Sequence, residues 1–205
     1  AAYSEFMLKG LYQYIHTSHV LVIQWDGFIS NPGRWHADFL KYDYVGAVWP
    51  QFDDGDRVGN GGFSLRSVKL LEALQSPNFD VYHPEDVAIC RLYKKRLHDE
   101  YDVVVAPEHL ANQFAVERQG DAAHAFGFHG FSNMMDVLSE SEFQALLDRL
   151  PPDVFLSTEA RRAVRKLLDR GWPHLAHRVL AERVRHSRWS VSNLRLWTRI
   201  VLNRF

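Results

Sequence analysis

The sequence predicts an α/β domain followed by a helical region, and three observations support this prediction. Short apolar runs rich in β-branched residues, at 19–25 and 102–106, alternate with helical patterns up to about residue 135. From Ser139 onward only helical patterns occur. Residues 1–140 carry 11 Lys and Arg against 19 Asp and Glu, whereas residues 141–205 carry 13 against 6. We therefore expect an α/β domain over 1–138 and a basic helical region over 139–205.

The elements of the first domain follow from apolar spacing and turn residues. Helical spacing predicts a helix over 3–15, and the run at 19–25 predicts a buried strand that ends at Asp26-Gly27. Extended segments are expected over 44–49, 63–65 and 102–106, helices over 67–74 and 85–98, a loop over 51–57, and a loop or short helix over 107–114, and residues 126–130 close this part of the chain.

The sequence of the basic region predicts four helices. Ser139 and Glu142 form a capping-box pattern that opens a helix to about Leu150, where Pro151 and Pro152 end it. Further helices are expected over 158–170, 173–185 and 190–205.

Composition narrows the class of protein. With 46% hydrophobic residues, the chain can bury a substantial core. Its single cysteine, Cys90, excludes an internal disulfide framework and is expected to be a buried thiol. No apolar run reaches the ~18 residues that a membrane-spanning helix needs, and the N-terminus lacks the pattern of a signal peptide. A cytoplasmic protein is expected.

A glycine-rich segment followed by an acid pair is the strongest candidate site. Gly59, Gly61 and Gly62 surround Asn60, and Glu85-Asp86 comes about twenty residues later, directly after a proline. Glycines allow a tight turn or a close approach to a ligand, and Asn60 suits a sugar hydroxyl or a left-handed backbone. The acids suit either a general base or the solvated first turn of a helix.

Two isolated residues are candidate metal ligands. Asp26 follows a strand, where a carboxylate suits a hard divalent cation, but an Asp-Gly turn is very common and its spacing alone favours the turn. His129 lies in an aromatic, glycine-rich segment and is either a metal ligand or structural. The zinc-binding patterns His-x-x-x-His and Cys-x-x-Cys do not occur, and neither do a nucleophile elbow, a P-loop or a dinucleotide-binding pattern.

Five blocks taken together resemble a known family. In order they are Gln24-Trp25-Asp26-Gly27-Phe28, Tyr42 through Pro50, Val58-Gly-Asn-Gly-Gly-Phe-Ser-Leu-Arg66, Pro84-Glu85-Asp86 and Phe126-Gly-Phe-His-Gly130. Over about residues 3–132 the chain is similar to an uncharacterised bacterial family of glycosyltransferases with the GT-A fold, a Rossmann-like mixed sheet. The Gly-Asn-Gly-Gly-Phe-Ser-Leu-Arg block is the most specific.

The resemblance implies a role for each candidate residue. Asp26 and His129 would bind Mn²⁺ or Mg²⁺ against the diphosphate of a nucleotide-sugar donor. Gly59, Asn60, Gly61, Gly62 and Trp49 would contact donor or acceptor. Asp86, with Glu85 beside it, would supply the base of an inverting hexosyl or related transfer. The expected acceptor is a glycan or a lipid-linked glycan in bacterial surface-polysaccharide synthesis.

The sequence departs from this pattern at two points. The metal-binding Asp-x-Asp motif is reduced to Gln24-Trp25-Asp26, which keeps one carboxylate. Only about 25 residues precede Asp26, so the nucleotide-binding half of the fold is expected to be missing, either truncated or supplied by a partner chain. A non-catalytic carbohydrate-binding or scaffolding subunit is therefore the alternative, and a metal-dependent hydrolase would need more clustered ligands.

Two interpretations of the basic region are favoured over a third. Its arginines can form a solvated face of packed helices, or residues 188–205 can bind an anionic membrane surface at the inner face of the membrane. Nucleic-acid binding is not expected, because no recognisable motif supports it.

Overall fold

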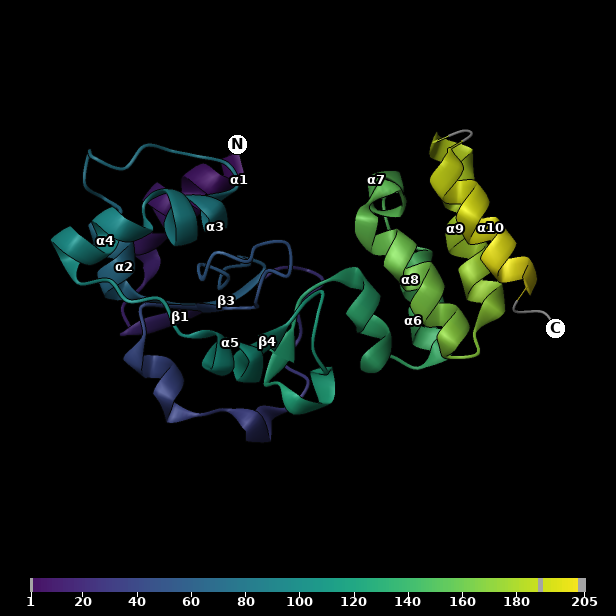
Figure 1. Cartoon of the computed structure of the whole chain (residues 1–205), viewed down its shortest axis with the longest axis horizontal. Coiled ribbons are helices and arrows are strands. Elements are labelled where there is room, and N and C mark those ends of the chain that lie inside the picture. Colours follow the sequence, from purple (N-terminus) through teal and green to yellow (C-terminus); the bar gives the residue numbers. More distant parts are fainter. Residues whose placement is uncertain (1, 188–189, 203–205) are drawn as a thin grey trace. The chain divides into compact units, whose positions relative to one another are not determined.

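The chain folds as two units that divide between His129 and Gly130 in a computed structural model, which describes residues 2–187 and 190–202 (Figure 1). The units are Ala1–His129 and Gly130–Phe205. The division lies earlier than the expected 138–139, because the 3₁₀ helix η7 (Phe131–Asp136) packs on helix α8 (Thr158–Asp169) of the second unit.

The first unit is mixed α/β and is built on a small antiparallel sheet. Strands β1 (His19–Ile23), β2 (Tyr44–Gly46) and β3 (Phe63–Ser67) are arranged in the order β1-β3-β2. The register places Leu21 and Val45 on either side of Leu65. The central strand β3 is buried along its whole length.

The predicted strand over 19–25 exists, but the expectation that it is buried was wrong. In β1 every residue is at least partly exposed, and Ile23 is 45% exposed. The reason is its position at the edge of the sheet, where it pairs with β3 alone.

The expected strand over 102–106 runs beside β2 through one parallel bridge between Tyr44 and Val105. The backbone amide of Asp43 donates to the carbonyl oxygen of Val104 at 2.8 Å, and the backbone amide of Ala106 donates to the carbonyl oxygen of Tyr44 at 2.9 Å. The segment is thus extended next to the sheet without forming a regular strand.

A second, two-stranded parallel sheet brings the end of the first unit to the loop after β1. It pairs β4 (Ala115–Val116) with β5 (Gly127–Phe128). Phe28 and Phe128 exchange backbone hydrogen bonds of 3.0 and 2.9 Å. This bridge draws the loop that holds Asp26 toward the segment that holds His129.

Three short 3₁₀ turns of the first unit, Pro32–Arg34, Ala37–Lys41 and Ala122–His124, were not predicted as helices, and the other helices match the predicted segments in position. They are α1 (Ala2–Glu5), which continues through a π turn (Phe6–Gly10) and a 3₁₀ turn (Leu11–Tyr14), α2 (Val68–Ala73), α3 (Glu85–Val87), which continues through a π turn (Ala88–Leu92), α4 (Lys94–Tyr101) and α5 (Glu108–Phe114). The predicted helix over 85–98 is interrupted by that π turn, where the amide of Tyr93 donates to the Ala88 carbonyl at 2.8 Å.

Aromatic packing forms much of the core of the first unit. Phe39, Phe63, Phe114 and Phe126 are almost fully buried, and the rings of Phe39 and Phe114 lie 5.1 Å apart in an edge-on contact. Cys90 is buried as predicted, and burial raises the pKa of its thiol.

The second unit is helical within the described residues, as predicted. It consists of η7, α6 (Glu140–Leu147), α7 (Pro152–Leu156), α8, α9 (Pro173–Ser187) and α10 (Val191–Leu202). The capping box of Ser139 and Glu142 is present in full. Gly171, at φ +81°, follows α8 in a conformation that favours glycine.

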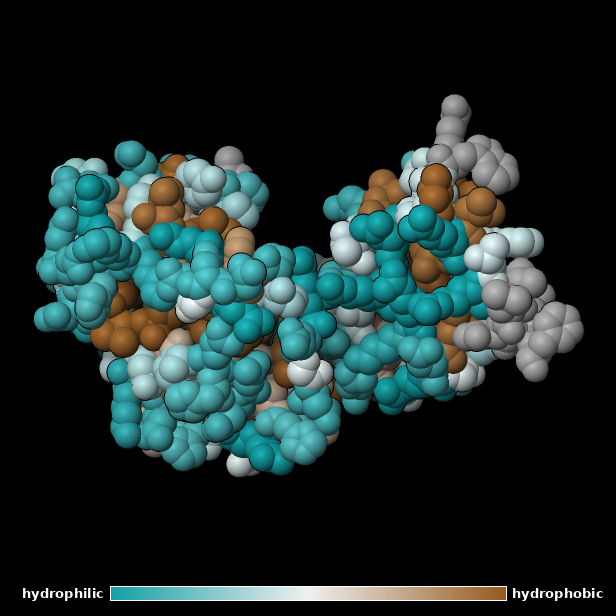
Figure 2. All heavy atoms as spheres, in the orientation of Figure 1, coloured by the Kyte–Doolittle hydropathy of each residue, from teal (hydrophilic) through white to brown (hydrophobic). Residues whose placement is uncertain are grey.

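The two units differ in net charge. Residues 130–205 carry 13 Lys and Arg against 8 Asp and Glu, whereas residues 1–129 carry 11 against 17. Hydrophilic side chains dominate the face in Figure 2, and apolar side chains interrupt them on both units, in the second unit over α9 and α10. Among the described residues, no helix has both the length and the apolar character needed to span a bilayer.

Candidate functional site

The glycine-rich segment forms a turn that is tied to the start of α3. Asn60 adopts the left-handed conformation at φ +58°, and its Oδ1 accepts a hydrogen bond from the Gly62 amide at 3.2 Å. The Gly61 amide donates to Asp86 Oδ2 at 2.9 Å. Two segments about 25 residues apart in sequence are thereby held together.

Neighbouring side chains fill the space that these glycines leave. A Cβ at Gly59 would lie 2.1 Å from the ring of Trp49, one at Gly61 would lie 2.4 Å from Glu85 Oε1, and one at Gly62 would lie 2.1 Å from His129 Nε2. Glycine is therefore required at each position for close packing inside the protein. A substrate that contacts these three glycines would therefore meet their backbone atoms.

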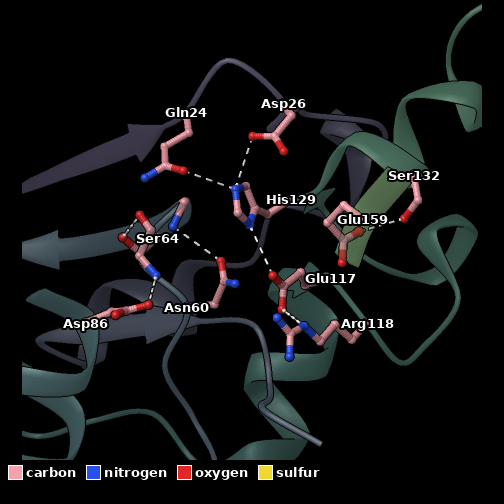
Figure 3. A network of polar contacts seen from close by, with 12 residues as sticks. Gln24, Asp26, Asn60, Ser64, Asp86, Glu117, Arg118, His129, Ser132 and Glu159 are labelled. Carbon is pink, nitrogen blue, oxygen red and sulfur yellow. Dashed lines mark hydrogen bonds and ion pairs between the residues drawn. The ribbon is translucent and has the colours of Figure 1, made fainter. Parts of the chain in front are cut away.

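His129 is the centre of a polar cluster, which we define as Gln24, Asp26, Glu117 and His129 (Figure 3). Its Nε2 lies 3.2 Å from Asp26 Oδ1 and 3.2 Å from Gln24 Oε1, and its Nδ1 lies 3.5 Å from Glu117 Oε1. Glu117 also pairs with Arg118 at 3.3 Å. The imidazole is thus held between two carboxylates.

This environment changes the protonation of His129. Burial lowers the pKa of the imidazole, but the hydrogen bonds and charges of Asp26 and Glu117 outweigh burial and raise that pKa to about 9. The metal-free cluster therefore contains an imidazolium at neutral pH.

The two adjacent acids have different surroundings. Glu85 is 4% exposed, and its Oε1 accepts a hydrogen bond of 3.0 Å from Nη2 of the fully buried Arg66. Arg66 Nε donates to Ser64 Oγ at 3.0 Å. This buried ion pair joins the central strand β3 to the start of α3.

Asp86 is half-exposed and fixed by two backbone amides. Its Oδ2 accepts from Gly61 and its Oδ1 accepts from Val87 at 2.8 Å. The carboxylate keeps a defined orientation at the edge of the turn, where solvent reaches it.

The structure brings most of the predicted residues together. Asp26 contacts His129, Gly62 lies beneath the His129 ring, and Gly61 bonds to Asp86. Trp49 is 4% exposed and lies against Gly59 in the core, so its burial favours a packing role over substrate contact.

Sequence reasoning did not assign three further residues of this region: Gln24, Glu117 and Arg66. Gln24 and Arg66 lie inside two of the quoted blocks, but neither had been given a function. Glu117 follows β4 in no recognisable motif, and only the pairing of β4 with β5 places it beside His129.

The packing of His129 on Gly62 gives a first prediction. Gly62→Ala should destabilise the protein by roughly 1–3 kcal/mol, because the new methyl group would overlap the imidazole and displace it. Urea unfolding monitored by circular dichroism measures this. Gly33→Ala is the matched control, since nothing lies within 4 Å of a Cβ there. Equal, small effects of both substitutions would show that His129 does not rest on Gly62.

The raised pKa of His129 gives a second prediction, for the metal-free protein. The native pKa of about 9 exceeds the usual 6.5, so the stabilisation is complete below about pH 6.5 and is lost as pH rises through about 9. The size of this stabilisation is roughly 3 kcal/mol. Between about pH 6.5 and 9, the free energy of unfolding in urea should therefore fall more for wild type than for His129→Gln. Parallel pH profiles of the two proteins would rule out the ion-paired imidazolium.

Comparison with known proteins agrees with the division into units. The first unit is a mixed α/β domain with a partly buried polar cluster, and the family described as "Protein of unknown function (DUF5672)" matches residues 1–129. The chain belongs to this family. No curated protein matches the chain, and no solved structure does.

Proposed function

We propose that the first unit is the GT-A-like part of a glycosyltransferase, which moves a hexose or related sugar from a nucleoside-diphosphate sugar to an acceptor hydroxyl with inversion. The observation that carries the proposal is convergence. Asp26, Gly61, Gly62, Asp86 and His129 come from four separate segments and are joined by direct contacts. If these residues only formed separate turns and helix starts, their four segments would not need to contact one another.

The polar cluster offers donors suited to Mn²⁺ or Mg²⁺. Asp26 Oδ1 and His129 Nε2, 3.2 Å apart, are a carboxylate oxygen and an imidazole nitrogen, and the amide oxygen of Gln24 lies equally close to Nε2. Among the described residues, no group of three or more His, Cys, Asp or Glu side chains could hold a metal. Asp26 and His129 would therefore hold the ion weakly, since the His129 imidazolium must first lose its proton, and phosphate oxygens of the donor would complete the ion's shell. A bound metal would neutralise the departing nucleoside diphosphate.

Asp86 is the better candidate for the general base. Its carboxylate is half-exposed and oriented by Gly61 and Val87, so it can accept the proton of an acceptor hydroxyl that approaches the turn. Glu85 is instead committed to Arg66. We assign Glu85 a positioning role, since it fixes the start of the helix on which Asp86 lies.

A non-catalytic carbohydrate-binding subunit is the second candidate. Trp25 and Phe28 flank Asp26 and are 54% and 46% exposed, and exposed aromatic faces suit the stacking of sugar rings. Both oxygens of Asp86 already accept backbone hydrogen bonds, which favours a binding or structural role for this acid. Under this alternative a glycan would bind without turnover.

The proposal also covers the acceptor of the sugar and the place where the protein acts. A lipid-linked or surface glycan, built in the cytoplasm or at the inner face of a bacterial membrane, suits the basic second unit. Residues 188–189 and 203–205 of the proposed membrane-binding segment 188–205 lie outside the described residues, so this idea relies on α10.

Release of nucleoside diphosphate from a panel of sugar donors, in the presence of Mn²⁺ and candidate acceptors, separates the two candidates. Acceptor-dependent release supports the transferase. Glycan binding on an array without release from any donor supports the binding subunit.

A further inference from the structure

Four arginines line one groove of the second unit. The groove lies between α8 and α10, has a volume of about 540 Å³, and contains Arg161, Arg165, Arg195 and Arg199. The arginines form two pairs at a spacing of four residues, one pair on each helix, and this spacing places both members of a pair on one helix face. The volume is in the range of small-molecule sites.

These arginines differ from the other basic residues of α8 and α9. On α8, Arg162 pairs with Glu159 and Lys166 pairs with Asp136, which also pairs with Arg170 just after the helix. On α9, Arg178 pairs with Asp148 and Arg185 pairs with Glu182. In the described part of the chain, no carboxylate pairs with any of the four groove arginines. Arg161 donates to the Thr158 hydroxyl at 3.1 Å. The groove therefore collects positive charge that the carboxylates of the described residues leave uncompensated.

A fifth arginine adds to this charge from inside the unit. Arg183 of α9 is 5% exposed, and its guanidinium donates to neutral acceptors, the Ser157 carbonyl at 2.8 Å and Asn193 Oδ1 at 3.2 Å. Burial lowers the pKa of Arg183, and the charge of Arg161 lowers it further. An anion in the groove would relieve this repulsion.

We propose that the groove between α8 and α10 binds a phosphate-bearing ligand through Arg161, Arg165, Arg195 and Arg199. Guanidinium groups bind phosphate oxygens in pairs of parallel hydrogen bonds, and several of them suit an anion with more than one negative charge. Ser192 lines the same groove and can add a hydroxyl donor, while Val191 and Leu196 give it an apolar edge. The ligand's phosphate belongs either to a soluble diphosphate or to a lipid headgroup. This inference does not depend on the proposed function of the first unit.

The test uses the full chain and two probes. Calorimetry with inorganic pyrophosphate tests a soluble ligand, and sedimentation with phosphatidylcholine vesicles, with and without phosphatidic acid, tests a headgroup. The exposed pair R165A/R199A should weaken binding about tenfold or more, since two guanidinium groups that donate charged hydrogen bonds to the phosphate are lost. The control R34A/R149A removes the same charge from exposed arginines that do not line the groove.

Each outcome decides the proposal. Pyrophosphate binding that R165A/R199A weakens and R34A/R149A preserves supports a soluble phosphate ligand. Vesicle binding alone, with the same dependence on the groove arginines and on phosphatidic acid, supports a lipid phosphate. Failure of wild type to bind either probe, or equal weakening in both double variants, overturns the proposal.

Discussion

Asp86→Asn is expected to lower the rate of sugar transfer by about 10²–10⁴-fold, the usual contribution of a positioned general base. The amide that replaces the carboxylate is a poor base, but its oxygen can still accept the hydrogen bond of Gly61. Donor affinity and folding should therefore change little. Initial rates of nucleoside diphosphate release, measured with the donor that wild type uses, give the ratio.

Asp53→Asn is the matched control for this change, because Asp53 is an exposed carboxylate in the acidic loop of the same unit. It should keep the wild-type rate. Full activity of Asp86→Asn would refute the assignment of the base, and loss of activity together with loss of the folded signal would indicate a structural role.

Arg66→Met is expected to reduce the free energy of unfolding by about 3–5 kcal/mol, the cost of breaking a buried ion pair from one side. Arg66 is fully buried, and its removal would leave the carboxylate of Glu85 without its cationic partner. Equilibrium unfolding in urea measures the loss. Arg66→Met combined with Glu85→Gln should recover part of it, since the uncompensated charge is then gone.

Lys95→Met provides the comparison at the surface. Lys95 pairs with Asp99 on α4 but is 88% exposed, so its loss should cost about 0–1 kcal/mol. Comparable effects of Arg66→Met and Lys95→Met would contradict the view that the Arg66–Glu85 pair anchors α3 to the sheet.

The fold was predictable where the signal is local. The capping box of Ser139 and Glu142 and the apolar spacing of residues 3–15 depend on neighbours within one or two turns, and both predictions were confirmed. Strand burial depends on distant pairing instead. The apolar run of β1 became the exposed edge, while β3 became the buried centre although it contains Ser64 and Arg66. Arg66 can be buried there only because Glu85, nineteen residues later, compensates its charge.

The candidate site shows the same limit. The glycine turn and the acid pair were visible in the sequence, but their spacing could not show that Glu85 is buried and Asp86 half-exposed. Glu117 belongs to the cluster only through the pairing of β4 with β5, and the packing of Trp49 on Gly59 is a tertiary contact. Sequence patterns therefore identified the segments that form the candidate site. The role of each residue in it depends on long-range contacts that only the structure shows.

Calorimetric titration of a panel of nucleoside-diphosphate sugars, with and without Mn²⁺, tests the transferase proposal most directly. Wild type should bind one donor in the presence of Mn²⁺, and binding should be lost without the metal and in Asp26→Asn. Asp53→Asn, which changes a carboxylate outside the cluster, should bind as wild type does. No binding to any donor would indicate that this chain lacks the nucleotide-binding half. Metal-independent binding, or binding that Asp26→Asn leaves unchanged, would instead contradict the proposal that Asp26 and His129 hold a cation against the donor diphosphate.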